Sequence, residues 1–220
     1  MSKTAVKEIG IKDELVEYLR NPLKEIRIKD ELDNYINGFL KYSITRVSSI
    51  KRYNTRKFIS PQSVLEHLAG VTLISMVISD YFNQQGIKNN AERVLRMAIT
   101  HDLDEVVSGD IPHDVKYKYG KESEKLRKAL SFITDRTIKS MYEQLGDKKL
   151  IDSYISLYME EKEKQTLEAK IVKLADFIDV MIYSTTELSL GNTTIIPEKE
   201  NSTERYQELL HSVLSEVFSK

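Results

Sequence analysis

The stretch THDLDEVVSGDIPHD, residues 100–114, contains two histidines and five acidic residues in fifteen positions. They include two His-Asp pairs, His101-Asp102 and His113-Asp114. Imidazole nitrogens and carboxylate oxygens are the ligands of many divalent transition metals. Because the chain contains no cysteine, thiolate zinc sites are excluded, and any metal must be held by histidine and carboxylate.

The two pairs differ in their predicted surroundings. His101-Asp102 follows the apolar run VLRMAIT and is predicted to lie on a buried helix that extends from Ala91 to about Val107. His113-Asp114 follows GDIP and is predicted to lie in a loop. Metal ligands need rotamers that are fixed by packing and by outer hydrogen bonds. We therefore select the first pair as candidate ligands and interpret the second as a non-ligand pair.

Two further polar residues interrupt otherwise apolar helical segments. His67 lies in SVLEHLAGV and Asp176 lies in AKIVKLADFIDV. Taken alone, a histidine of this kind is more often a hydrogen-bonded core residue, and such an aspartate is more often salt-bridged. Together with His101-Asp102 they form the order H…HD…D along the chain.

This order resembles the HD superfamily of metal-dependent phosphohydrolases, and the surrounding segments are similar to the bacterial HD-domain 5′-deoxynucleotidases. The resemblance covers roughly residues 30–192. It rests on RYNTRKFISPQSVLEH (52–67), HDLDEVVSGDIPHDVKY (101–117), LYMEEKE (157–163), EAKIVKLADFIDV (168–180) and ELSLGN (187–192). Tyr53 stands where the bacterial enzymes commonly have Trp, a departure that bears on sugar discrimination.

The resemblance implies a role for each candidate residue. One divalent transition metal (Co, Mn, Zn, Fe or Ni) would be held by four ligands: His67, His101, Asp102 and Asp176. Glu105 would act as general acid or base, and substrate would contact Arg52, Tyr53, Asp110 and Lys116. Glu161 or Glu160 would orient a neighbouring group. Simpler interpretations stay open: Glu105 and Lys116 could be exposed residues without a role in catalysis or binding, and Asp110 could serve to form a turn without contacting substrate.

The elements that position these residues are predicted to be helices. Apolar spacing indicates helices over 11–20, 28–42, 91–107, 122–145, 148–162 and 166–190, and a last helix from Tyr206. One more helix is predicted to end at Gly86. It begins either at Ser60-Pro61 or at an alternative capping box formed by Ser63 and Glu66. Residues 192–202 are predicted to form a loop. We expect an all-α, HD-type helical bundle over 30–220, with an N-terminal helical extension (1–29) and a C-terminal helix.

Composition restricts the partners. The net charge of −1 provides no overall field to attract nucleic acid, although Lys41 to Lys57 contains six basic residues and no acid. That segment is either a solvated basic stretch or a patch that faces phosphate. No membrane-length apolar stretch and no signal peptide are recognised, so a cytoplasmic protein without a membrane partner is expected. The resemblance implies a nucleotide substrate and a homodimer or higher homo-oligomer.

The expected activity is hydrolysis of deoxyribonucleoside 5′-monophosphates (dNMPs) to deoxynucleoside and phosphate. One alternative is a dNTP triphosphohydrolase that acts on dATP or a relative and releases tripolyphosphate, because the same metal centre could serve either reaction. A second alternative is a non-enzymatic helical binding module that retains the HD scaffold.

Overall fold

The computed structural model describes residues 29–30, 32–33 and 41–219. The chain divides into two compact units, Met1–Tyr42 and Ser43–Lys220, and the second carries all the candidate site residues. The predicted helix 11–20 lies outside the described residues. Of the predicted helix 28–42, only a few residues are described, and these are helical. The assignment of 1–29 to a separate extension stays a prediction.

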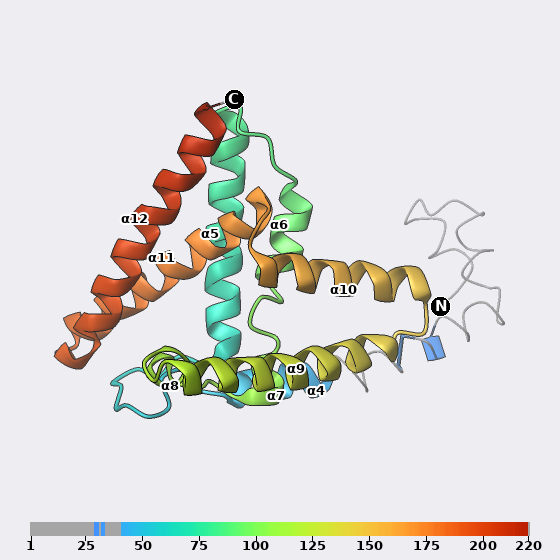
Figure 1. Ribbon diagram of the computed structural model, residues 1–220, viewed down its shortest axis with the longest axis horizontal. Coiled ribbons are helices and arrows are strands. Elements are labelled where there is room, and N and C mark those ends of the chain that lie inside the picture. The colour runs from blue at the N-terminus through green and yellow to red at the C-terminus, as the bar shows by residue number, and fades with distance from the viewer. Residues whose placement is uncertain (1–28, 31, 34–40, 220) are drawn as a thin grey trace, which may run out of the picture. The chain divides into compact units, whose positions relative to one another are not determined.

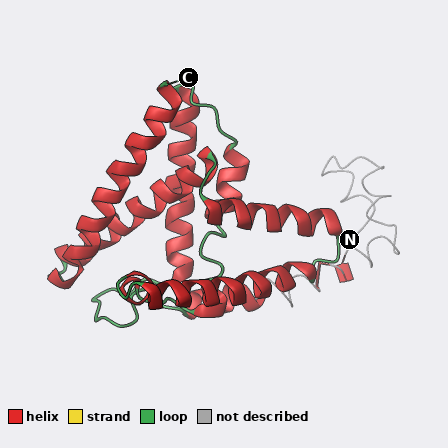
Figure 2. Cartoon of the chain, in the orientation of Figure 1, coloured by secondary structure: helices red, strands yellow, loops and turns green. Residues whose placement is uncertain are grey.

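Helices joined by turns make up the described part of the chain, which contains no strand beyond one isolated bridge between Lys51 and Ser63 (Figures 1 and 2). The predicted all-α class is confirmed. The elements are α4 (Lys41–Ser49), α5 (Val64–Gln84), α6 (Ala91–Ala98), α7 (Glu105–Ser108), α8 (His113–Tyr117), α9 (Lys121–Glu143), α10 (Lys148–Glu163), α11 (Leu167–Ser189), η2 (Thr193–Ile195) and α12 (Ile196–Phe218).

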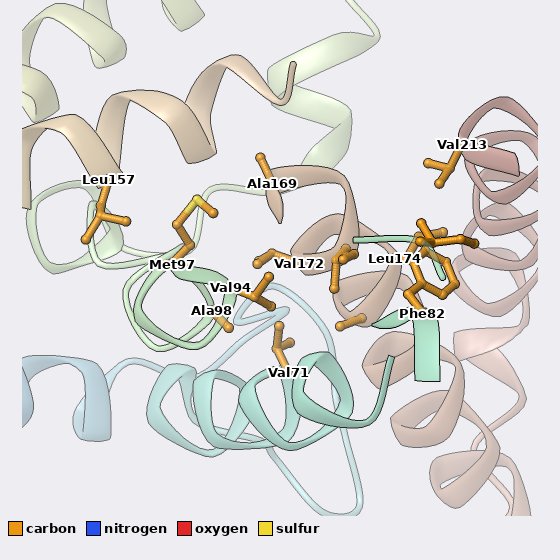
Figure 3. Close-up of a cluster of buried hydrophobic side chains, with 13 residues drawn as sticks. Val71, Phe82, Val94, Met97, Ala98, Leu157, Ala169, Val172, Leu174 and Val213 are labelled. Carbon is orange, nitrogen blue, oxygen red and sulfur yellow. The ribbon is translucent and has the colours of Figure 1, made fainter. Parts of the chain in front are cut away.

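Helix α11 is the centre of the packing and contacts α5, α6 and α12 (Figure 1). Its apolar residues recur at helical spacing, so one broad face is buried. The main core joins α5, α6, α10, α11 and α12 (Figure 3), through Val71, Phe82, Ile87, Val94, Met97, Ala98, Leu157, Ala169, Ile171, Val172, Leu174, Ala175 and Val213. This arrangement brings the N-terminal half of α5 beside the middle of α11, where His67 and Asp176 lie.

Helix α5 begins at the capping box and not at Ser60-Pro61. The Ser63 hydroxyl accepts a hydrogen bond from the Glu66 N–H at 3.2 Å, and the Glu66 carboxylate accepts one from the Ser63 N–H at 2.5 Å. These bonds satisfy two N–H groups that lack partners within the helix. His67 therefore lies in the first turn of α5, near a well-defined helix end.

We expect Ser63→Ala to lower the free energy of unfolding by about 1 kcal/mol, because it removes the oxygen that accepts from the Glu66 N–H. Urea unfolding followed by circular dichroism measures this value. Ser48→Ala is the control, since that exposed hydroxyl bonds only to the Thr45 carbonyl. Equal stability of the two variants would contradict the assigned cap.

The predicted continuous helix 91–107 is wrong between α6 and α7, where residues 99–104 form turns. Helix α6 ends at Ala98. Between α6 and α7 the backbone hydrogen bonds join residues three apart: the Leu103 N–H donates to the Thr100 carbonyl, and the Glu105 N–H donates to the Asp102 carbonyl. The carbonyl of Ala98 accepts a bond from His101 Nδ1 at 2.8 Å instead of continuing the helix. His101 and Asp102 thus lie in a tight turn, which can aim two adjacent side chains at one point.

Two other predictions differ from the structure. His113 and Asp114 begin the short helix α8 and do not lie in a loop. The predicted loop 192–202 contains η2 and the start of α12, which begins ten residues before Tyr206. Pro197 does not prevent this, because proline is compatible with the first turn of a helix. Helix α4 also covers much of the basic run that starts at Lys41.

Helix α5 is long and apolar enough, by length and composition over a window of 18 residues, to cross a membrane. Core helices of globular proteins reach the same length and composition, so α5 is not a clear membrane span. One third of that window is buried, and the buried face includes His67 and residues of the core cluster. We assign α5 to the core of the helical unit.

Candidate metal centre

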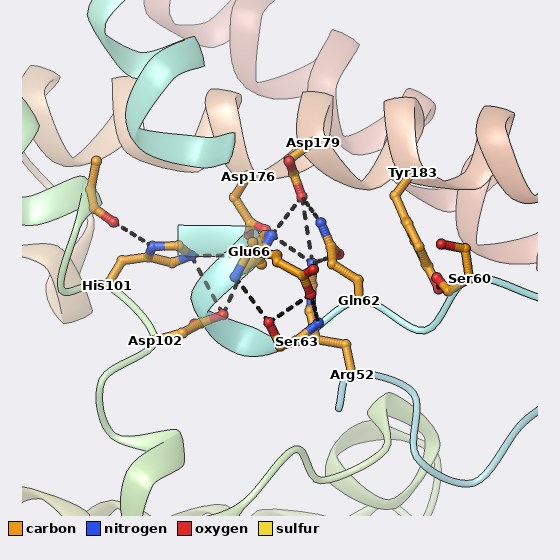
Figure 4. A network of polar contacts seen from close by, with 12 residues as sticks. Arg52, Ser60, Gln62, Ser63, Glu66, His101, Asp102, Asp176, Asp179 and Tyr183 are labelled. Carbon is orange, nitrogen blue, oxygen red and sulfur yellow. Dashed lines mark hydrogen bonds and ion pairs between the residues drawn. The ribbon is translucent and has the colours of Figure 1, made fainter. Parts of the chain in front are cut away.

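Three predicted ligands, His67, His101 and Asp102, each place one ligand atom within 4.8 Å of the others, and Asp176 reaches His67 from α11 (Figure 4). His67 Nε2 lies 3.2 Å from His101 Nε2, 3.4 Å from Asp102 Oδ2 and 3.3 Å from Asp176 Oδ1. His101 Nε2 lies 3.4 Å from the same Asp102 oxygen. Ligand atoms bound at about 2.1 Å to one cation are roughly 3.0 to 3.4 Å apart. The spacing and donor types therefore fit one divalent transition metal.

Outer contacts orient three of the four predicted ligands. His101 donates from Nδ1 to the Ala98 carbonyl at 2.8 Å, which leaves Nε2 free to face the centre. His67 Nδ1 lies 2.6 Å from Asp179 Oδ2. The second carboxylate oxygen of Asp176 accepts a hydrogen bond from Lys173 Nζ at 2.5 Å. Contacts of this kind hold metal ligands in a binding orientation.

The electrostatics of the centre favour ionised carboxylates. Burial acts to raise the pKa of Asp102 and of Asp176. The positive charge of His101 acts most strongly in the opposite direction on Asp102, and that of Lys173 on Asp176, so both pKa values are lowered. Burial and Arg52 act to lower the pKa of His67, yet hydrogen bonds to Asp102, Asp176 and Asp179 raise it to about 10. Ionised carboxylates therefore face the His67 ring and stabilise positive charge there.

Glu105 begins α7 and is buried. Its Oε2 has no hydrogen-bond partner among the described residues. Burial, followed by the charges of Asp102 and Asp110, raises the pKa of Glu105 well above its usual value. The exposed-residue interpretation of Glu105 is wrong, and its carboxyl keeps a proton to higher pH than an exposed glutamate does.

Arg52 lies at the centre, where the predicted phosphate clamp would be. Its Nη1 is 2.6 Å from His67 Nδ1 and donates to Gln62 Oε1 at 3.3 Å. The rest of the basic run differs, since Arg56 pairs with Glu198 of α12 at 2.5 Å. Arg52 of the basic run therefore lies beside a predicted ligand, whereas Arg56 joins the run to α12.

Tyr53 and Asp110 are tied to one another. The Tyr53 N–H donates to Asp110 Oδ2, and Asn54 Nδ2 donates to the Asp110 carbonyl at 3.1 Å. Tyr53 has a φ of 54°, and its ring stacks parallel to Tyr183 with centroids 6.1 Å apart. The Arg52 guanidinium lies 5.3 Å from the Tyr53 ring centroid. The backbone bond to Asp110 therefore helps to place Arg52.

A cavity of about 310 Å³ opens beside the ligands. It is lined by His101, Asp102, Asp104, Lys116, Tyr117, Tyr158, Glu161, Lys162, Lys164, Val172, Lys173 and Asp176. Glu161 belongs to this cavity, whereas Glu160 forms an ion pair with Arg93 and accepts a bond from Thr166. Lys116 lines the cavity and has no carboxylate within ion-pair distance among the described residues. In the other His-Asp pair, the Asp114 carboxylate forms an ion pair with Lys118 at 2.6 Å.

Sequence reasoning missed two residues that contact the ligands, Lys173 and Asp179. Each lies three positions from Asp176 on α11, so the three share one helix face. The polar spacing in KLADFID was a visible signal. It did not show which residue of α5 these side chains would meet.

Comparisons with solved structures agree with this fold. A phosphohydrolase with an HD domain (lin2634) from Listeria innocua matches with a TM-score of 0.66 at 25% identity, covering 81% of this chain and 85% of that one. The PH0347 protein from Pyrococcus horikoshii OT3 matches with a TM-score of 0.58 at 24% identity, over 78% and 94% of the two chains. The second similarity shows the fold alone.

Sequence comparisons identify the family. The 5′-deoxynucleotidase VV1113 of Vibrio vulnificus is 32% identical over 150 residues, which cover 68% of this chain and 74% of that protein. A 5′-deoxynucleotidase of Erwinia tasmaniensis is 27% identical over 157 residues, covering 71% and 76%. The family model described as 5′-deoxynucleotidase YfbR-like matches residues 38–219. The chain belongs to the YfbR-like 5′-deoxynucleotidase family of hydrolases.

Proposed function

We propose that this chain hydrolyses deoxyribonucleoside 5′-monophosphates to deoxynucleoside and phosphate. The supporting observation is the convergence of His67, His101, Asp102 and Asp176 beside the buried carboxyl of Glu105. The names of the Vibrio and Erwinia relatives support the same substrate class.

The chemistry that a divalent metal would supply, when held by these four ligands, is polarisation of a phosphate oxygen and a lowered pKa for water. The N₂O₂ donor set suits Mn, Fe, Co, Ni or Zn. Arg52 would bind the phosphate through charged N–H groups. Glu105 would give its proton to the 5′-oxygen as the P–O bond breaks. Asp110 would accept from a sugar hydroxyl with its remaining lone pairs, and Tyr53 would contact the sugar or base.

The test is phosphate release from dNMPs and NMPs after removal of bound metal and addition of each of the five metals in turn. We expect turnover of dNMPs with at least one metal and none in the presence of a chelator. Absence of turnover with every metal would contradict the proposal.

A second candidate activity is release of tripolyphosphate from a dNTP. The supporting observation is the cavity beside the ligands, to which Lys116, Lys162, Lys164 and Lys173 contribute. Three of these lysines already contact carboxylates, Lys162 with Asp135, Lys164 with Glu161 and Lys173 with Asp176. Product analysis separates the two activities, since a dNMP yields orthophosphate and a dNTP yields tripolyphosphate.

We expect Lys116→Ala to lower kcat/KM about tenfold for the preferred nucleotide, because one charge-assisted hydrogen bond contributes about 1.5 kcal/mol. Steady-state kinetics measures the loss. Lys118→Ala is the matched control, since Lys118 bonds Asp114 and does not line the cavity. Equal kinetics of the two variants would show that Lys116 does not contact substrate.

The remaining expectations are proposed as well: a cytoplasmic enzyme with no stable nucleic-acid or membrane partner, which forms a homodimer or higher homo-oligomer. Exposed apolar side chains on one face of α5, at Leu73, Val77 and Tyr81, support self-association. Light scattering coupled to size exclusion would report the mass, and a mass near 25.5 kDa would contradict the oligomer.

A further inference from the structure

We infer that Asp179 is a positioning residue of the metal centre, which holds His67 with Nε2 toward the cation, and that Gly70 is required to make room for it. The inference rests on the proposed function, because it concerns the same metal centre. It assigns roles to two residues beyond the four ligands and Glu105.

The contact between Asp179 and His67 is close and buried. Asp179 Oδ2 lies 2.6 Å from His67 Nδ1, and His67 is fully buried while Asp179 is 6% exposed. Gln62 Nε2 donates to the same Asp179 oxygen at 3.2 Å (Figure 4). Asp179 comes from α11 and His67 from α5, so the contact joins the two helices that supply His67 and Asp176.

The chemistry of imidazole makes this contact directional. A neutral histidine has one N–H donor and one acceptor nitrogen, so Nε2 can bind a cation only when Nδ1 carries the proton. That proton needs an acceptor, and the Asp179 carboxylate provides one. The other neighbour of Nδ1 is Arg52 Nη1 at 2.6 Å, which is also a donor.

Arg52 and Asp179 are therefore competing partners for His67. Arg52 can donate only to an unprotonated Nδ1, and that tautomer directs an N–H from Nε2 into the centre. Asp179 supports the opposite tautomer, which binds metal. Arg52 has other acceptors nearby, Gln62 Oε1 at 3.3 Å and Asp179 Oδ2 at 3.7 Å, so it can leave His67. Arg52 would therefore keep acceptors for its N–H groups if His67 Nδ1 carried the proton.

Gly70 provides the space that Asp179 occupies. It lies three residues after His67 on α5, on the same face of the helix. A Cβ atom at Gly70 would lie 2.1 Å from Asp179 Oδ1, far inside van der Waals contact. Because both atoms belong to packed helices, the Asp179 carboxylate would have to move away from His67.

We expect Asp179→Asn to weaken the binding of Zn²⁺ about 10- to 100-fold, the range typical when a hydrogen-bond partner of a ligand histidine is removed. Asp179→Ala and Gly70→Ala should show losses in the same range. Competition between the protein and a chromophoric chelator for Zn²⁺, without nucleotide, measures this affinity. Glu187→Gln is the matched control: it changes a buried carboxylate of the same helix that accepts from the Ile59 and Ser60 N–H groups and contacts neither histidine. Its Zn²⁺ affinity should equal that of the wild type.

The double variant Gly70→Ala/Asp179→Ala separates positioning from general damage. Once Asp179 Oδ1 is absent, a Cβ at position 70 has no atom to displace, so the two losses should not add. Additive losses, or Zn²⁺ affinity within twofold of wild type for folded Asp179→Asn, would overturn the inference. If the wild type binds Zn²⁺ tightly and Asp179→Asn binds weakly, but no nucleotide is hydrolysed, the proposed function fails while this inference stands.

Discussion

Asp176→Ala is expected to remove metal binding and nucleotide hydrolysis together. Asp176 is the ligand that we propose for α11: its Oδ1 lies 3.3 Å from His67 Nε2, and its other carboxylate oxygen pairs with Lys173. Lewis-acid stabilisation by a metal contributes several kcal/mol to the transition state, so loss of about 4 kcal/mol lowers the rate about 10³-fold.

The measurement combines metal content by mass spectrometry with initial rates of dNMP hydrolysis. Asp152→Ala is the control, because Asp152 is an exposed helical aspartate of α10 that does not line the cavity. Circular dichroism establishes that both variants are folded. Wild-type metal content and wild-type rates in a folded Asp176→Ala protein would refute the assignment of Asp176 as a metal ligand.

Glu105→Gln is expected to lower kcat about 10²- to 10⁴-fold while the metal remains bound. Glutamine keeps the volume and polarity of the side chain, but it has no acidic proton to give to the leaving 5′-oxygen. The substitution also removes a buried carboxyl whose Oε2 lacks a partner among the described residues, so we expect no loss of stability.

The pH dependence of kcat follows from the same group. Burial and the nearby charges of Asp102 and Asp110 raise the pKa of Glu105, which keeps its carboxyl protonated to higher pH than usual. The protonated form is the donor, so kcat should fall as the pH rises through the raised pKa. This alkaline decline should disappear in Glu105→Gln. A variant with wild-type kcat and an unchanged profile would exclude Glu105 as the proton donor.

Much of the fold follows from local patterns in the sequence. Helices α9, α10 and α11 lie within a few residues of their predicted bounds, because each has apolar residues at helical spacing and a defined stop or cap. The capping box at Ser63 was also readable, since its two bonds join residues only three apart. The start of α12 could not be predicted from the sequence, because its first ten residues lack a regular apolar face.

The sequence by itself determined the all-α class, the family, and which histidines and aspartates could serve as metal ligands. Only the tertiary structure decided how these side chains are aimed. His101 ends α6 by bonding the Ala98 carbonyl, and Asp179 meets His67 across 112 residues in the space left by Gly70. Local patterns depend on bonds between residues a few positions apart, whereas the direction of a buried side chain depends on packing between distant helices.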